Sequence, residues 1–152
     1  ITEWDICQIH GLVCKGERGA GAYRTVNVMA AGSNYRYPDA ILVSELMQEF
    51  GDWLHSNPAL HPVEIATEIH YRLVTIHPFQ DGNGRTARLL MNLSLLRFGY
   101  PIAVIKTEDR SAYIDAIVAW QSGGDNSALK ETIAKCVESS LVEILSLAGE
   151  GV

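Results

Sequence analysis

Apolar residues recur every three or four positions through most of the chain, which is the spacing of an amphipathic helix. Residues 62–76 show the clearest repeat, and the apolar positions on one face there are Val63, Ala66, Ile69, Leu73 and Ile76. The same periodicity, bounded by glycine, proline or capping residues, predicts six helices, over residues 2–13, 38–55, 62–76, 85–98, 109–121 and 127–147. Thr2 is expected to cap the first helix, with Asp5 at the capping-box position.

Residues 16–38 interrupt this helical pattern. The β-prone stretch 23–29, the Gly32-Ser33-Asn34 turn and the tyrosine-rich stretch 35–37 together predict a short β-hairpin at about residues 23–38. With 152 residues and 47% hydrophobic content, the chain can build one domain around a proper core. We therefore expect a single all-α domain over residues 1–152 that carries one small β-hairpin.

Composition limits the compartment and the partners. Three cysteines, an odd number, do not make a disulfide framework, which favours a reducing, cytoplasmic location. The sequence shows neither a stretch of about 18 apolar residues nor a secretion signal, so no membrane partner is expected. The net charge of −6 argues against nucleic acid as the main partner, because phosphate backbones are bound by extended basic faces.

Positive charge is nevertheless concentrated in one region. Residues 72–106 hold five basic side chains against Asp81 alone. Within this region, the stretch His77-Pro-Phe-Gln-Asp-Gly-Asn-Gly-Arg-Thr-Ala-Arg88 lies between two predicted helices, and its Asp-Gly and Asn-Gly pairs favour turns with inward N–H groups. Arg85 and Arg88 would fall in the first turn of the second helix, where each cation costs about 0.3–1 kcal/mol against the helix dipole. This arrangement predicts an anion site, with His77 as a base beside it.

Other interpretations of this stretch are weaker. Gly82-x-Gly84-x-x-Ala87 formally matches a dinucleotide-binding fingerprint, but a helix precedes it where that motif needs a strand, and no βαβ units follow. The sequence also lacks a phosphate-binding GxxxxGK[ST] loop. A purely structural alternative remains, in which Asp81 and the arginines form ion pairs and His77 is a buried hydrogen-bonding residue. The density of the cluster favours the anion site.

The stretch from His77 to Arg88 resembles the signature of the Fic family, HxFx(D/E)GNGRxxR, and matches it at every specified position. Further stretches resemble the animal and bacterial Fic adenylyltransferases, at residues 60–64, 88–92, 99–101 and 110–111. The resemblance runs over nearly the whole chain. It implies a Fic-type helical bundle with a hairpin flap at about 23–38, a catalytic loop at 77–88 and a C-terminal helix at about 127–147.

The activity implied by this resemblance is transfer of AMP from MgATP to a Ser, Thr or Tyr hydroxyl of a target protein, with release of pyrophosphate. Phosphotransferase members replace the second motif glycine with lysine, and phosphocholine transferases replace the first with alanine. This chain keeps Gly82 and Gly84, which favours AMP transfer. Alternatives are removal of AMP at the same site, or a nucleotide-binding regulatory or toxin module held inactive by an antitoxin. A homo-oligomer is a further possible assembly.

The resemblance also implies a role for each motif residue. His77 would be the general base and Asp81 the ligand of Mg²⁺. Backbone N–H groups from Gly82 to Arg85 would face phosphate oxygens. Contacts to the α-, β- and γ-phosphates would come from Asn83, Arg85 and Arg88 in that order, while Thr86 and Ala87 would contribute chiefly helix and backbone.

Outside the motif, the resemblance implies that the target docks on the flap by β-augmentation. Positions that match nucleotide contacts are Gly32, Ser33, Asn34, Tyr35, Tyr113 and Gln121. For Tyr113 the alternative is an ordinary core residue of an amphipathic helix.

The C-terminal stretch 146–151 resembles the inhibitory (S/T)xxxE(G/N) motif of the family, whose glutamate, here Glu150, would pair with Arg88. A frayed tail is the alternative. Near the N-terminus, Cys7, His10 and Cys14 share one predicted helix face, and a packed face is favoured there over a zinc site, because a fourth ligand is lacking.

Overall fold

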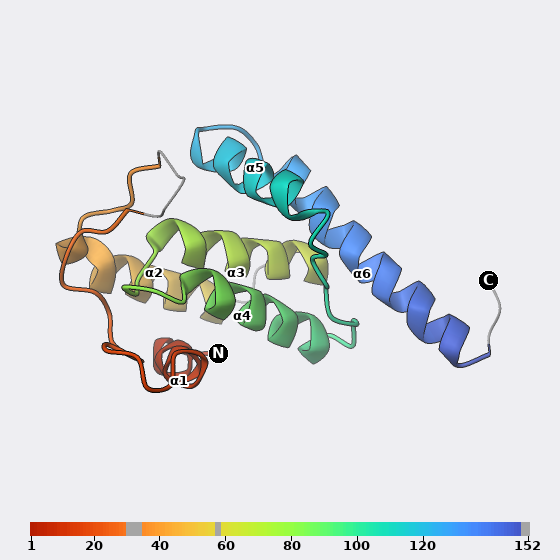
Figure 1. The fold of residues 1–152 in the computed structure, drawn as a ribbon, viewed down its shortest axis with the longest axis horizontal. Coiled ribbons are helices and arrows are strands. Elements are labelled where there is room, and N and C mark those ends of the chain that lie inside the picture. The colour runs from red at the N-terminus through yellow and green to blue at the C-terminus, as the bar shows by residue number, and fades with distance from the viewer. Residues whose placement is uncertain (30–34, 57–58, 150–152) are drawn as a thin grey trace. The chain divides into compact units, whose positions relative to one another are not determined.

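The computed structural model describes residues 1–29, 35–56 and 59–149, and these residues contain helices and no strand (Figure 1). The elements in chain order are α1 (Glu3–Val13), the 3-10 turn η1 (Ala40–Leu42), α2 (Val43–His55), α3 (Pro62–Ile76), α4 (Asn83–Arg97), α5 (Arg110–Gln121) and α6 (Ser127–Leu147). All six predicted helices are confirmed. The largest boundary difference is at α2, which begins at Val43, five residues after the predicted start, and follows the 3-10 turn η1. Helix α4 begins at Asn83, two residues before its predicted start.

The predicted capping box at the start of α1 is present. The Thr2 hydroxyl accepts a hydrogen bond from the backbone N–H of Asp5 at 3.2 Å. In return, the Asp5 carboxylate accepts from the backbone N–H of Thr2 at 2.8 Å. Two N–H groups that the helix itself leaves without an acceptor are thereby satisfied.

The β-hairpin predicted at about residues 23–38 is not seen in the described parts of that segment, 23–29 and 35–38. Side chains, and not a strand ladder, hold the backbone there. The Arg24 guanidinium donates to the carbonyl oxygens of Val26 and Pro38, at 3.1 and 2.6 Å. The Asn27 side chain accepts from the backbone N–H of Ala40 at 2.7 Å. The Gly32-Ser33-Asn34 turn lies outside the described residues.

The chain divides into two compact units, each with its own buried residues. The first comprises Ile1–Leu60 and Glu68–Leu90, and it contains the whole 77–88 motif. Its fully buried side chains come from α1, α2, α3, the motif and α4, and include Ile6, Met47, Phe50, Leu73, Phe79 and Leu90. Helix α1 contacts α2. This packing gives the motif loop a rigid base, because buried apolar side chains of this size each stabilise the fold by about 1.5–3 kcal/mol.

The second unit comprises His61–Thr67 and Met91–Val152. Helices α5 and α6 pack against each other and bury Tyr113, Ala116, Ile117, Leu129, Ile133 and Val137. The Lys130 ammonium forms an ion pair with Glu64 at 3.0 Å, which joins α6 to the start of α3. The Asn92 side chain accepts from the Ala103 N–H at 2.8 Å and so fixes the stretch that leads from α4 to α5.

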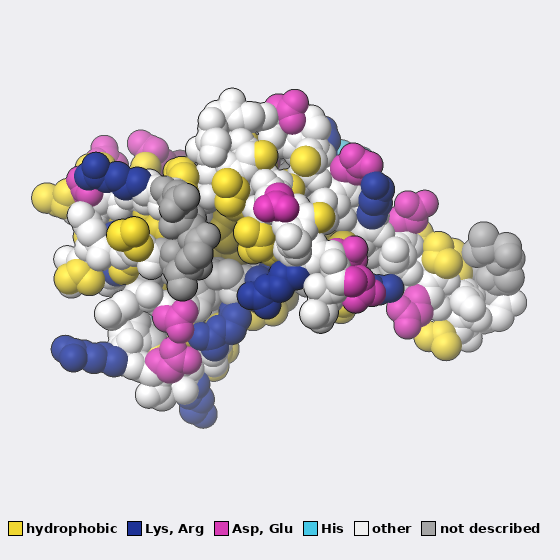
Figure 2. Space-filling model, turned by 45° about the horizontal axis from the view of Figure 1, so that its top comes forward, with side chains coloured by type: hydrophobic (Ala, Val, Ile, Leu, Met, Phe, Trp, Pro, Cys, Tyr) yellow, Lys and Arg dark blue, Asp and Glu magenta, His cyan; other side chains and the backbone are white. Residues whose placement is uncertain are grey.

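The surface is mixed in charge. Figure 2 shows acidic and basic side chains close to one another on the face drawn, with apolar side chains between them. Within the described residues, none of the helices combines the length and apolar character needed to cross a bilayer.

Candidate functional site

The 77–88 loop begins with an unusual backbone conformation. His77 directly follows α3 and has a φ of 52°, in the left-handed region that residues other than glycine rarely adopt. Its N–H still donates to the Leu73 carbonyl at 2.9 Å and so completes the last turn of α3. Pro78 cannot continue a helix, because its ring clashes with the preceding turn. Together these two residues turn the chain sharply away from α3.

The hydrogen bond of the His77 ring defines which nitrogen is basic. Its Nδ1 lies 3.2 Å from the carbonyl oxygen of Val74. A carbonyl oxygen can only accept, so Nδ1 carries the proton and Nε2 keeps its lone pair. The Tyr37 ring stacks on the imidazole, with centroids 3.9 Å apart. Burial lowers the pKa of His77, and the charge of Arg24 lowers it further, against the opposing effects of the Val74 carbonyl and Asp81.

Arg24 connects the segment between α1 and α2 to this loop. Its side chain is buried, with 5% of the residue exposed. Its Nε donates to the carbonyl oxygen of His77 at 2.8 Å, and its backbone N–H donates to that of Pro78, also at 2.8 Å. The sequence patterns did not indicate Arg24 or Tyr37 as site residues. No local pattern marks an arginine that will be buried against backbone carbonyls.

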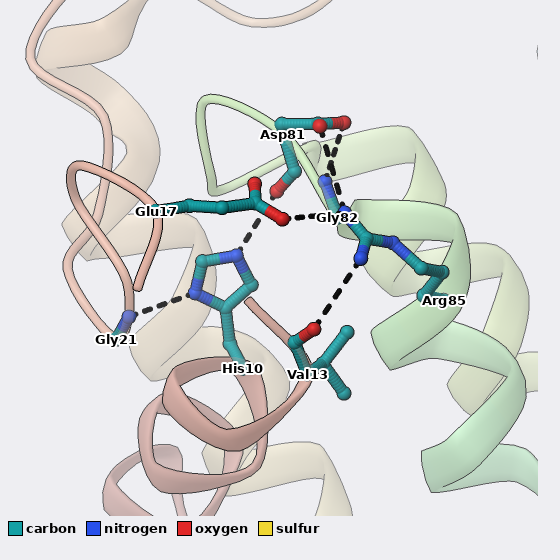
Figure 3. Close-up of polar contacts among 7 residues, drawn as sticks. All are labelled: His10, Val13, Glu17, Gly21, Asp81, Gly82 and Arg85. Atoms are coloured by element: carbon teal, nitrogen blue, oxygen red, sulfur yellow. Dashed lines mark hydrogen bonds and ion pairs between the residues drawn. The ribbon is translucent and has the colours of Figure 1, made fainter. Parts of the chain in front are cut away.

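His10 of α1 supports the loop from below (Figure 3). Its ring stacks on the buried ring of Phe79, with centroids 3.7 Å apart and planes 1° from parallel. Nδ1 accepts from the backbone N–H of Gly21 at 2.9 Å, so Nε2 is protonated and donates to the Asp81 carbonyl at 3.0 Å. Burial lowers the pKa of His10. Both ring nitrogens are thus engaged, which argues for the packed face over the zinc alternative.

Gly82 is required by both its backbone and its surroundings. Its φ is 75°, and a Cβ added there would collide with Cys14 Sγ and lie 3.1 Å from His10 Nε2. Asn83, the first residue of α4, is 2% exposed. Its side chain accepts from the Phe79 N–H and donates to the Phe79 carbonyl, both at 2.9 Å. This pair of bonds closes the loop and explains why α4 starts earlier than its apolar pattern predicts.

The start of α4 offers several N–H groups. Thr86 donates to the Gly82 carbonyl at 2.9 Å, so the N–H groups of Asn83, Gly84 and Arg85 come before the first repeat of the helical bonding pattern. Such groups, at the positive end of a helix, suit an anion. Thr86 and Ala87 are fully buried and anchor this end of α4. Burial, with the charge of Arg88, lowers the pKa of the neighbouring α3 residue His70 to about 3, which keeps that ring neutral.

Arg85 lies between two carboxylates (Figure 3). Its Nη2 is 3.5 Å from Asp81 Oδ2 and 3.4 Å from Glu17 Oε1, and its Nη1 donates to the Val13 carbonyl at 3.3 Å. The Asp81 side chain is 80% exposed. Beside these residues is a hollow of about 260 Å³, whose lining includes His10, Glu17, Arg18, Gln80 and Asp81. The pairs are open to solvent, so a polyanion and a cation can replace them at little cost.

The remaining predicted site residues belong to several other elements of the chain. Tyr35 is partly exposed, and its ring meets that of Tyr37 edge-on at 5.3 Å. Tyr113 is 3% exposed within α5 of the second unit, and Gln121 is the last residue of that helix. Arg88 is half-buried on α4. Gly32, Ser33, Asn34 and Glu150 lie outside the described residues, so their predicted roles stay predictions.

Structures of similar proteins have been solved. Fic-1 from C. elegans superposes with a TM-score of 0.87 at 32% sequence identity, over 98% of this chain and 44% of that one. A Fic domain containing signaling protein from Bacteroides thetaiotaomicron gives a TM-score of 0.81 at 31% identity, over 99% of this chain and 65% of that one.

Sequence comparison agrees. The protein adenylyltransferase Fic of Nematostella vectensis is 40% identical over 145 residues, which make up 93% of this chain and 33% of that protein. The protein of the same name from Drosophila willistoni is 41% identical over 93% of this chain and 28% of its own length. This chain therefore spans about a third or less of these two relatives. The Fic/DOC family matches residues 1–95, more than half of the sequence, and the chain belongs to that family.

Proposed function

We propose that this protein transfers AMP from MgATP to a hydroxyl side chain of a target protein and releases pyrophosphate. The observation that carries the proposal is the position of the neutral His77 ring. Its basic Nε2 belongs to the same loop as an α4 N-terminus that also bears Arg85 and Arg88. A base next to an anion site is what attack of a hydroxyl on a phosphate ester requires. The names of the curated relatives given above support this reaction.

In the proposed reaction, Nε2 of His77 accepts the proton of the target hydroxyl. The oxygen then forms a bond to the α-phosphorus, and the bond from that phosphorus to the oxygen bridging the β-phosphate breaks. Pyrophosphate leaves with the electron pair of that bond. General-base catalysis of this kind contributes about 10²–10⁴-fold to the rate. The lowered pKa of His77 fits the role, because the ring is neutral and able to accept a proton at pH 7.

The residues at the start of α4 fit a magnesium nucleotide. The exposed Asp81 carboxylate supplies the oxygen ligands that Mg²⁺ prefers. A bound Mg²⁺ would neutralise charge that develops on the leaving pyrophosphate. The Asn83 side-chain amide donates one hydrogen to the Phe79 carbonyl and has a second that can be donated to an α-phosphate oxygen. Arg85 and Arg88 are then the partners of the β- and γ-phosphates.

The target is proposed to dock on residues 23–38, next to His77. Arg24 and Tyr37 of that segment touch His77, so a target chain lying along it would bring its hydroxyl close to the base. We further propose Gly32, Ser33, Asn34 and Tyr35 as nucleotide contacts from this segment, and Tyr113 and Gln121 as contacts on the adenosine side.

The test uses two labels on ATP. The protein is incubated with Mg²⁺, a cell lysate and either [α-³²P]ATP or [γ-³²P]ATP, and the proteins are separated. Compared with lysate alone, the added protein should increase the α-position label on proteins and should leave the γ-position label unchanged. An increase in γ label above the lysate's own would indicate a phosphotransferase, and no increase in either label would contradict the proposal.

A further inference from the structure

Arg24 is a buried cation, and among the described residues its hydrogen bonds go to backbone carbonyls. Within the described residues its guanidinium forms no ion pair, although the charge of Asp39 acts on it from a distance. A buried guanidinium is costly unless its donors are satisfied. Here the donors reach three carbonyl oxygens, those of Val26, Pro38 and His77. The planar fork of arginine suits this task, because it directs several donors along fixed, diverging lines.

These three carbonyls belong to separate places in the first unit. Val26 and Pro38 are the two ends of the segment 26–38, and one guanidinium holds both. The third carbonyl, that of His77, belongs to the motif loop. One side chain therefore closes the segment and fastens it to the residue that carries the proposed base.

The bonds also act on the strained part of the loop. Arg24 Nε donates to the carbonyl oxygen of the His77–Pro78 peptide bond, and the Arg24 N–H donates to the carbonyl oxygen of Pro78, in the next peptide bond. These two hydrogen bonds fix the path of the backbone directly after His77, whose φ is in the left-handed region. The bond from His77 Nδ1 to Val74 depends on that backbone, because it returns to the last turn of α3. Tyr37, the neighbour of Pro38, stacks on the same ring.

We propose that Arg24 is a positioning residue for AMP transfer, which holds the His77 ring in its proton-accepting orientation and ties both ends of segment 26–38 to it. This inference rests on the proposed function. Arg24 then supports both the segment on which the target is proposed to dock and the orientation of the His77 ring. Loss of Arg24 should impair the transfer step and leave MgATP binding at the α4 N-terminus unchanged.

The first test reads the His77 tautomer by NMR on protein with isotope-labelled histidine. The His77 signals are assigned by their absence in His77→Ala. Wild type should show the Nδ1–H tautomer. In Arg24→Lys and Arg24→Gln the Nε2–H tautomer, which free imidazole side chains prefer, should become the major form. A lysine keeps the charge but ends in a single compact ammonium, which cannot reach three diverging carbonyls.

Two matched variants control for disturbance of the same segment. Arg36→Gln removes an arginine whose side chain is 88% exposed and paired with Asp39. Asn27→Ala removes the bonds to Asp39 and Ala40 without touching His77. Both should keep the wild-type tautomer. If Arg24→Gln does not fold, Arg24→Lys and the wild-type protein still test the proposal. Finding the Nε2–H tautomer of His77 in the wild-type protein would by itself overturn it.

The second test separates the kinetic parameters of labelling with [α-³²P]ATP in a lysate. Arg24→Lys should lower kcat at least about tenfold and leave the KM for MgATP within about twofold of wild type. A wild-type kcat together with a wild-type tautomer in this variant would overturn the positioning role, and so would a raised KM alone. If the wild type itself transfers no AMP, the proposed function fails, while the tautomer test still decides whether Arg24 positions His77.

Discussion

His77 Nδ1 lies 3.2 Å from the carbonyl oxygen of Val74, one helical turn before it. This single contact assigns the ring proton to Nδ1 and leaves Nε2 as the base. It exists because His77 leaves α3 in a left-handed conformation, which brings the ring back over the last turn of the helix. The proposed chemistry therefore depends on a backbone feature.

Replacing the base should separate binding from transfer. His77→Ala is expected to lower AMP transfer by about 10²–10⁴-fold, because the variant lacks the imidazole that takes the hydroxyl proton. MgATP affinity should stay close to wild type, since the imidazole acts on the hydroxyl and not on the phosphates. Quantitative labelling and calorimetry on the same preparations provide the two measurements. Transfer at the wild-type rate would remove His77 from its proposed role.

The rate of AMP transfer should fall only at acidic pH, with a midpoint below 6.5. Burial depresses the pKa of His77 below its ordinary value of 6.5, and only the neutral ring can accept a proton. The rate of transfer should therefore rise with pH through a midpoint below 6.5 and be level near pH 7. The measurement is kcat/KM for MgATP against pH, because this ratio reports ionisation in the free protein, to which the lowered pKa applies. An acid limb centred above pH 6.5 would disagree with the burial of this ring.

The anion site predicts different losses for its two kinds of residue. Arg85→Ala should weaken MgATP binding about 10–100-fold, the range for charge-assisted hydrogen bonds of about 1.5–3 kcal/mol. Asp81→Ala should abolish the dependence of binding on Mg²⁺ together with activity. Calorimetry with and without Mg²⁺ measures both, and Arg36→Ala serves as the exposed-arginine control. Unchanged MgATP affinity in both site variants would return the cluster to a purely structural role.

Gly82 should resist substitution for two separable reasons. Gly82→Ala places a side chain at a φ of 75° and drives its Cβ into Cys14 Sγ. The backbone conformation costs about 1–2 kcal/mol, and overpacking adds about 1–3 kcal/mol. Chemical unfolding should show a smaller loss in the free energy of unfolding when Gly82→Ala is made in a Cys14→Ala background, because Sγ is absent there. An equal loss in both backgrounds would rule out the collision.

The six helices could be predicted because their signals are local. Thr2 and Asp5 cap α1 from three residues apart, and the apolar repeat of residues 62–76 is the repeat of α3 itself. The hairpin prediction was wrong for the described residues, because it used the β-propensity of residues 23–29. Arg24 and Asn27 instead bind that backbone through their side chains.

The motif could likewise be found from sequence, but the contacts that orient it could not. Arg24 reaches His77 across 53 positions, and no periodicity or spacing reports such a contact. The same holds for His10, which is 71 positions from the Asp81 carbonyl that it binds. The position of His10 on an apolar helix face indicated that it would be buried. It did not indicate which backbone group the ring would bind.

AMP transfer with His77 as the base is tested most directly by mass spectrometry of proteins from a lysate treated with MgATP and either wild type or His77→Ala. With the wild type, peptides should carry one AMP on a serine, threonine or tyrosine hydroxyl, and with the variant none should do so above background. Equal modification by both proteins, or modification by phosphate alone, would contradict it.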